Sequence, residues 1–89
     1  MPISFEDLKI WKESHRLMLK VYQLTSTFPR SETYALTDQL RRAALSVSAN
    51  IAEAHGRYHY LDKIKFLFNA RGSLEEVRSP LMAARELKY

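Results

Sequence analysis

The stretch from Leu36 to Arg57, LTDQLRRAALSVSANIAEAHGR, decides the fold of this chain. Its apolar residues recur every three or four positions, which is the period of an α-helix with one buried face. Several of them are alanines, whose small side chains let a second helix approach closely. Ser31 and Thr37 are candidate N-terminal caps, and Gly56 is typical of a helix C-terminus. We therefore predict a helix over about residues 32–55.

Two further helical patterns flank this stretch. Before it, Ser4 is a candidate N-cap, and an apolar pattern of helical period continues to Phe28, which the following proline disfavours as a helical residue. After it, apolar residues at helical spacing continue almost to the end of the sequence. The sequence thus predicts a single all-α domain over 1–89, an up-and-down antiparallel bundle of three long helices at about 5–27, 32–55 and 58–88.

The last of these helices carries more apolar surface than one neighbouring helix can cover. Phe66 and Phe68 flank Leu67, so the two rings cannot both face the same core. Gly72 lies in the middle of the helix, where it costs about 1 kcal/mol relative to alanine, and we take it to mark the close approach of another backbone. We predict that part of this surface packs against another subunit.

The composition argues against several classes of protein. Cysteine is absent, so neither a disulfide nor a thiolate ligand or nucleophile is available. The first residues do not form a signal peptide, and no apolar run approaches the roughly 18 residues that cross a bilayer. We expect a cytoplasmic protein with no membrane association.

No motif in the chain indicates catalysis, a cofactor or a metal. There is no GxSxG nucleophile elbow and no glycine-rich phosphate loop, so we predict that the protein is not an enzyme and holds no cofactor. His55 and His59 have the spacing of a helical metal site, with Glu53 nearby. Gly56 falls between the two histidines at the expected helix end, so we predict solvated side chains and no metal site.

Basic residues give the chain its one candidate binding surface, with a net charge of +4. Such side chains neutralise phosphates without reading base sequence. An acidic residue lies four positions before Arg42 and another lies four positions before Arg57 in the sequence. This spacing favours the alternative that the two arginines form ordinary surface ion pairs. Arg41 has a further alternative, because it borders the alanine-rich stripe and is expected to pair with a carboxylate on another helix. The candidate nucleic-acid-binding residues are Arg41, Arg42, Arg57, Lys63, Lys65 and Arg71.

Four segments carry a resemblance to a known family: FEDLKIWKES from Phe5, VYQLTSTFP from Val21, the stretch quoted above, and FLFNARGSLEEV from Phe66. Together they resemble the four-helix bundle proteins encoded within intervening sequences of bacterial 23S ribosomal RNA genes, which are related to the accessory protein of diversity-generating retroelements. The resemblance implies four antiparallel helices and a ring-shaped homo-oligomer, typically a pentamer. In the retroelement relatives, the basic surface of the ring contacts nucleic acid and a reverse transcriptase.

The sequence departs from that family pattern in four places. Ala35 and Ala54 stand where glycine is usual, and Pro80 falls inside the third helix. The sequence also ends where the fourth helix is expected, so we expect either that a neighbouring subunit covers the exposed face or that this is a shortened member whose assembly and function differ from those of its family. The function predicted is a non-catalytic oligomeric protein that binds RNA or DNA weakly or docks a nucleic-acid enzyme such as a reverse transcriptase. The alternative is a structural or protein-interaction module whose positive charge is incidental.

Overall fold

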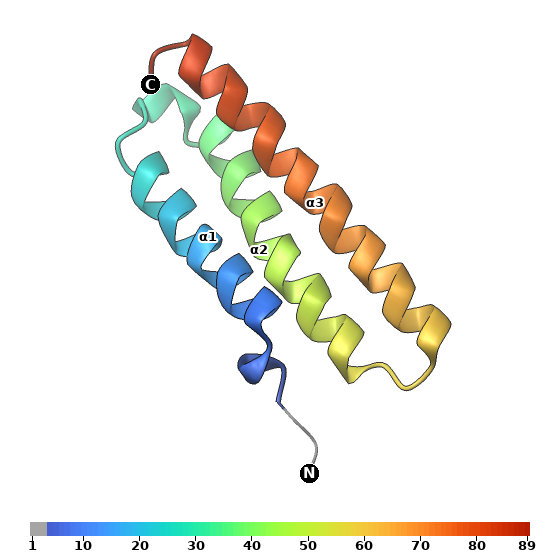
Figure 1. Cartoon of the computed structure of the whole chain (residues 1–89). Helices are drawn as coiled ribbons and strands as arrows, with labels where there is room; N and C mark the ends of the chain where they lie inside the picture. Colours follow the sequence, from blue (N-terminus) through green and yellow to red (C-terminus); the bar gives the residue numbers. More distant parts are fainter. Residues whose placement is uncertain (1–3) are drawn as a thin grey trace.

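A computed structural model describes residues 4–89, which form three long helices and two short 3-10 turns (Figure 1). Consecutive long helices run antiparallel, and the described residues contain no strand. The predicted all-α, three-helix fold is therefore confirmed. None of the helices in this range is both long and apolar enough to cross a membrane. In chain order the elements are η1 (Phe5–Asp7), α1 (Lys9–Thr25), η2 (Arg30–Glu32), α2 (Leu36–Gly56) and α3 (Tyr60–Glu86).

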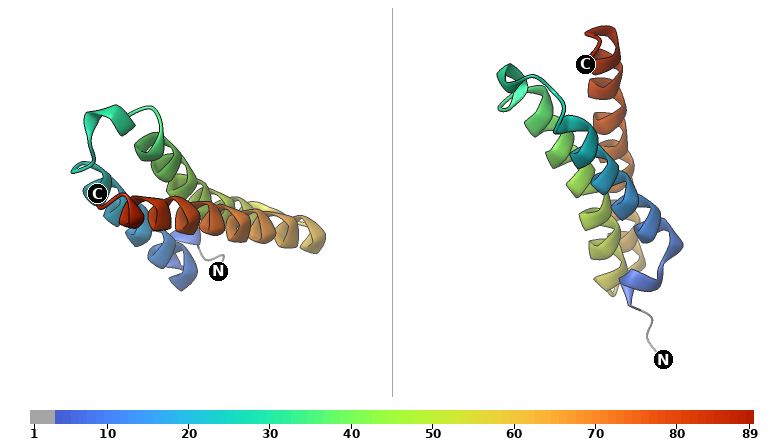
Figure 2. Two further views of the ribbon diagram at one scale, coloured as in Figure 1. Left: turned by 90° about the horizontal axis from the view of Figure 1, so that it is seen from above. Right: turned by 90° about the vertical axis from the view of Figure 1, so that its left-hand side faces the viewer.

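The central element is α2, because it packs against both other helices. No Cα atom of α1 comes within 8 Å of one in α3 over the described elements. Figure 1 shows α1 and α3 on either side of α2, and Figure 2 shows α2 and α3 diverging toward the C-terminal end of α3. The arrangement leaves α1 and α3 parallel to each other and separated over one face of α2.

The core lies along α2, as the helical period of its apolar residues predicts. Leu40 is completely buried, and Ala43 and Ala44 beside it are buried too, which confirms that the alanines allow close packing. Val77 is the most deeply buried large side chain of α3. Full burial of a side chain such as Leu40 contributes about 1.5–3 kcal/mol relative to exposure. The core is thus narrow and concentrated on one helix.

The helices α1 and α2 do not begin at the residues predicted to cap them. Ser4 caps η1, where its Oγ accepts a hydrogen bond from the Glu6 amide at 3.3 Å, and α1 proper begins only at Lys9. Ala35 precedes α2 and offers no side-chain cap. Instead, Oε1 of Glu32 accepts a hydrogen bond from the Leu36 amide at 3.4 Å. The candidate caps Ser31 and Thr37 are therefore both wrong, because a glutamate from the preceding turn takes that role.

The end of α3 is tied to the connection between α1 and α2. Lys88 adopts a left-handed conformation with φ of 63°, and the Tyr89 amide donates to the Ala84 carbonyl at 2.9 Å, which turns the chain back in a Schellman motif. The Tyr89 hydroxyl donates to Glu32 Oε2 at 2.7 Å. Its ring lies 5.5 Å from the Phe28 ring. Tyr89 thus links the C-terminal end of α3 to the connection between α1 and α2.

Two unusual residues lie inside α3. Pro80 is buried and does not end the helix, which continues to Glu86. Gly72 is exposed, and a methyl group added there would meet no atom within 4 Å of the described chain. The close backbone approach predicted at Gly72 does not occur within this single chain.

Candidate nucleic-acid interface

The six candidate basic residues lie in two separate parts of the molecule. Arg41 and Arg42 lie in the first turns of α2. Arg57, Lys63 and Lys65 lie at or just after the turn between α2 and α3, and Arg71 lies eleven residues into α3, near its middle. At a rise of 1.5 Å per residue, about 22 Å of helix separates Arg42 from Arg57. The structure therefore does not gather all six into one surface.

Arg41 is engaged by the C-terminal end of α1. Its Nε donates to Thr25 Oγ1 at 2.8 Å, and its Nη2 donates to the Tyr22 carbonyl at 3.4 Å. The guanidinium carbon also lies 4.6 Å from the centre of the Tyr22 ring. The predicted carboxylate partner is wrong, because the acceptors are a hydroxyl and a carbonyl at the negative end of a helix dipole.

Arg42 is exposed and pairs with its own helix. Its Nη1 lies 3.6 Å from Asp38 Oδ2, the ion pair that a spacing of four residues predicts. Exposed pairs of this kind contribute between zero and about 1 kcal/mol. Asp38 and Arg42 line a hollow of about 550 Å³ together with Glu76 of α3. Acidic and basic groups are mixed at this end of the molecule, so it offers no surface of one charge.

The other end of α2 holds two basic side chains with defined partners. Arg57 forms an ion pair with Glu53 at 2.7 Å, and its guanidinium carbon lies 4.6 Å from the centre of the Phe66 ring. Lys63 Nζ donates to the carbonyls of Ala54 and His55, at 3.4 and 3.2 Å. Both carbonyls belong to the last turn of α2, where the Ala54 oxygen also accepts from the Arg57 amide at 3.3 Å, so the lysine stabilises that helix end.

Lys65 and Arg71 differ from the other four. Both are exposed, and neither forms an ion pair or hydrogen bond within residues 4–89. They lie in the first half of α3, after the turn that carries Arg57. The part of the candidate surface with free positive charge is therefore the first half of α3.

The histidines do not converge on a metal-binding arrangement. Among residues 4–89 there is no group of three or more His, Asp or Glu side chains that could hold an ion. His15 instead stacks on Trp11, with ring centres 4.7 Å apart and planes 14° from parallel. His59 makes an edge contact with the Tyr58 ring at 5.2 Å. These residues act as aromatic surface in this fold.

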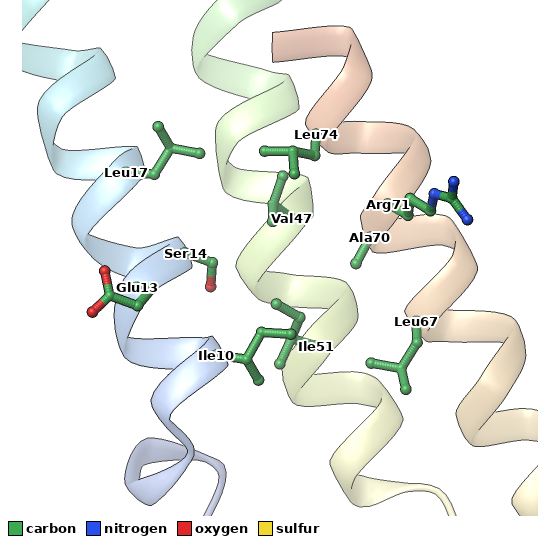
Figure 3. A pocket seen from close by; sticks show the side chains of 10 residues that line it. All are labelled: Ile10, Glu13, Ser14, Leu17, Val47, Ile51, Leu67, Ala70, Arg71 and Leu74. Atoms are coloured by element: carbon green, nitrogen blue, oxygen red, sulfur yellow. The ribbon is translucent and has the colours of Figure 1, made fainter. Parts of the chain in front are cut away.

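An apolar groove lies between α1 and α3, with α2 as its floor (Figure 3). Its volume is about 440 Å³. Glu13 stands at the α1 rim and Arg71 at the α3 rim. We call it the α1–α3 groove and define it by six side chains: Ile10, Leu17, Val47, Ile51, Leu67 and Leu74.

A family model described as 23S rRNA-intervening sequence protein matches residues 6–89, nearly the whole chain. The chain belongs to this family. No curated protein matches it closely enough to add a further relative. The match confirms the resemblance found in the sequence, and the name of the family describes no chemical reaction.

For this family member, sequence reasoning found the basic residues and missed the groove. The signal for the groove was present as spacings of seven residues, which place Ile10 with Leu17 and Leu67 with Leu74 on single helix faces. What the pattern did not reveal is that these two faces lie across from each other. That depends on α2 holding α1 and α3 apart.

Proposed function

We propose that this protein is a non-catalytic, oligomeric helical module that binds nucleic acid weakly through phosphate contacts along the first half of α3. The observation that carries the proposal is the exposure of Lys65 and Arg71 with no acidic partner in residues 4–89. Arg57 adds a third cation near the α2–α3 turn, although Glu53 partly neutralises it. Side chains of this kind bind phosphates and displace counterions, with no preference for base sequence.

Three cations in a single chain support only weak binding. In a homo-oligomer the same patch is repeated on each subunit, and simultaneous contacts raise the overall affinity without any new contact type. The resemblance to ring-forming relatives supports a pentamer. The same resemblance supports docking of a nucleic-acid enzyme, such as a reverse transcriptase. Weak binding of nucleic acid by this protein would then assist an enzyme that is already bound to it.

The test is a fluorescence-anisotropy titration with labelled RNA and DNA at low and rising salt. We expect binding that weakens steeply with salt, because counterion release gives a slope proportional to the number of phosphates neutralised. The variant Arg57→Glu, Lys65→Glu, Arg71→Glu is expected to lose this binding. The matched control is Lys9→Glu, Lys20→Glu, Arg30→Glu, which makes the same change in net charge at exposed positions elsewhere.

Two results would contradict the proposal. If both triple variants lose binding equally, net charge alone attracts the nucleic acid and the first half of α3 is not the contact surface. If the wild-type oligomer binds no nucleic acid at low salt, the nucleic-acid role fails altogether.

The second candidate function is a protein-interaction module with incidental charge, and the α1–α3 groove is the observation that favours it. An apolar groove of about 440 Å³ lined by side chains of all three helices fits a protein helix and not a phosphate backbone. The two functions separate if the charge-reversed variant still binds its protein partner but no longer binds nucleic acid.

A further inference from the structure

Aromatic rings are exposed on the side of α3 that faces away from α2. Phe68 is 63% exposed, and it lies nine residues, or about two and a half turns, before the buried Val77, which places the two on opposite sides of the helix. Tyr60, at the start of α3, is 73% exposed. Neither ring contacts another ring or a guanidinium group within residues 4–89. Large apolar side chains left in water in this way mark an interaction surface.

An unpaired cation lies one turn to either side of the Phe68 ring. Lys65 comes three residues before it and Arg71 three residues after it, and residues at this spacing are neighbours on a helix surface. Phe68 and Arg71 line the same shallow hollow. Arg71 also borders the α1–α3 groove, but Figure 3 shows its side chain pointing away from α1 and α2. We call Lys65, Phe68 and Arg71 the outer patch.

Acidic side chains nearby do not cancel the charge of the outer patch. Residues 53–71 contain four lysines and arginines but only two acids. Of these acids, Glu53 is held in an ion pair at 2.7 Å, and Asp62 lies one turn before Lys65 without pairing to it. Beyond the patch, Glu75 pairs at 3.1 Å with an arginine of its own helix. The partner that fits is therefore an anion that also presents flat apolar faces.

We propose that the outer patch binds single-stranded nucleic acid, with a base stacked on the Phe68 ring and phosphates held by Lys65 and Arg71. The two cations are about 9 Å apart along the helix axis, with the ring between them. Tyr60 offers a second ring about 12 Å from Phe68 along the same axis. Aromatic rings beside cations bind single strands with little preference for sequence, because every base has a flat face.

This inference rests on the proposed function and adds the strand state of the nucleic acid. The bases of a duplex are already stacked on one another, so a duplex offers this face only its phosphates. The cations also argue against two other occupants. An apolar protein surface would bury Lys65 and Arg71 without counter-charges, which is costly. A helix that lies on a membrane carries its cations on the face opposite its apolar residues, whereas here they flank the exposed ring.

The test is a fluorescence-anisotropy titration of the full chain with three labelled probes of equal length. The first is a single strand, the second is the duplex formed with its complement, and the third is a strand of abasic sugar-phosphate units, which has phosphates but no bases. We expect the single strand to bind more tightly than the abasic strand by about 5-fold or more, because bases stacked on an aromatic side chain add to the affinity.

Phe68→Ala is expected to weaken binding of the single strand by about 5-fold or more and to leave binding of the other two probes unchanged. The salt dependence of binding should stay that of the wild type, because no phosphate contact is lost. Phe68→Tyr keeps a ring and is expected to restore the affinity. Tyr34→Ala is the matched control, because it removes a 95% exposed ring from the mixed-charge end of the molecule, and it should bind as the wild type does.

Light scattering and circular dichroism on the same samples separate this role from a structural one. Phe68 is exposed, so Phe68→Ala should keep the mass and the helical content of the wild type. A lower mass, together with weaker binding of all three probes, would assign Phe68 to a subunit contact and overturn the inference.

Two further results would contradict the stacking contact alone. Equal affinity for the single-stranded and abasic probes would show that no base is bound, while the phosphate contacts of the proposed function remained. Binding to anionic phospholipid vesicles that depends on Phe68, with single-strand binding that does not, would assign the outer patch to a membrane surface. If the wild type binds none of the three probes, the inference and the nucleic-acid role fail together.

Discussion

Arg41 shows how one side chain can fix the position of a neighbouring helix. Its guanidinium meets a hydroxyl, a carbonyl and an aromatic ring, all from the last turns of α1. Thr25 is itself held in place, because its hydroxyl donates to the Val21 carbonyl at 2.7 Å. A planar group with several donors suits this arrangement better than a point charge does.

We expect Arg41→Lys to lower the free energy of unfolding by about 1–2 kcal/mol, because an ammonium group cannot keep both hydrogen bonds and the ring contact. Urea denaturation of the full chain measures this difference. The control is Arg42→Lys, an exposed neighbour expected to change stability by less than about 0.5 kcal/mol. Equal effects of the two substitutions would mean that the Arg41 contacts contribute nothing specific.

The sequence predicted part of the role of Arg41 and not the rest. Its place beside an alanine-rich stripe indicates partial burial, which the structure confirms. Its partners lie 16 and 19 residues earlier in the chain, on another helix. Patterns within one helix contain no information on such a contact, so a carboxylate was the expected partner and a hydroxyl is the observed one.

At the scale of the element, two lysines in one turn of α3 have different roles. Lys63 donates to the last carbonyls of α2, whereas Lys65 is exposed and unpaired within residues 4–89. The charge pattern treats them alike, because both lie in the same basic segment. The difference arises from the turn after Gly56, which brings only one of them to the end of α2.

We expect Lys63→Gln to destabilise the fold by about 0.5–1 kcal/mol, through loss of a cation at a helix C-terminus. Lys65→Gln should leave stability unchanged within about 0.5 kcal/mol while weakening nucleic-acid binding. Thermal denaturation and anisotropy on the same two samples measure both effects. The assignment is wrong if the stability loss appears in Lys65→Gln instead.

Helices were predictable from periodicity, and their ends were not. The period of the apolar residues predicted all three long helices, because each helix buries one stripe. The start of α2 depends on Glu32, which caps the Leu36 amide from outside the helix. That contact requires η2 to fold back on α2, and no local capping pattern describes it.

At the scale of the whole molecule, Tyr89 closes one end of the bundle. The hydrogen bond to Glu32 is the main cause that raises the pKa of Tyr89 above its ordinary value of 10.0, with smaller effects from desolvation and from the charge of Glu32. A raised pKa means that the fold favours the protonated phenol. Its contribution to stability is therefore complete below pH 10 and is lost as the pH rises through the raised pKa.

We expect the melting temperature of the wild type to fall more steeply above pH 10 than that of Tyr89→Phe. The phenylalanine keeps the ring contact with Phe28 but has no proton to lose. Tyr34→Phe is the control, because Tyr34 is 95% exposed, and its pH profile should follow the wild type. Identical profiles for all three proteins would show that the Tyr89–Glu32 bond does not contribute.

The excess apolar surface was predictable at this scale, and its shape was not. Phe66 and Phe68 on one helix required two different neighbours, and the structure places the first near α2 and leaves the second exposed. The groove exists because α1 and α3 do not meet. The distance between α1 and α3 depends on how the three helices pack together. The period of the apolar residues along the sequence does not specify that packing.

The central position of α2 also bears on how the chain reaches its fold. Wherever Cα atoms of two long helices come within 8 Å of each other, one of the helices is α2 and the other is the helix immediately before or after it in the sequence. Such nearest-neighbour contacts require closure of only short loops, and helical domains with this property fold within microseconds to milliseconds. The molecule is in effect two helical hairpins that share one helix, so either hairpin can form first and provide the surface on which the remaining helix docks.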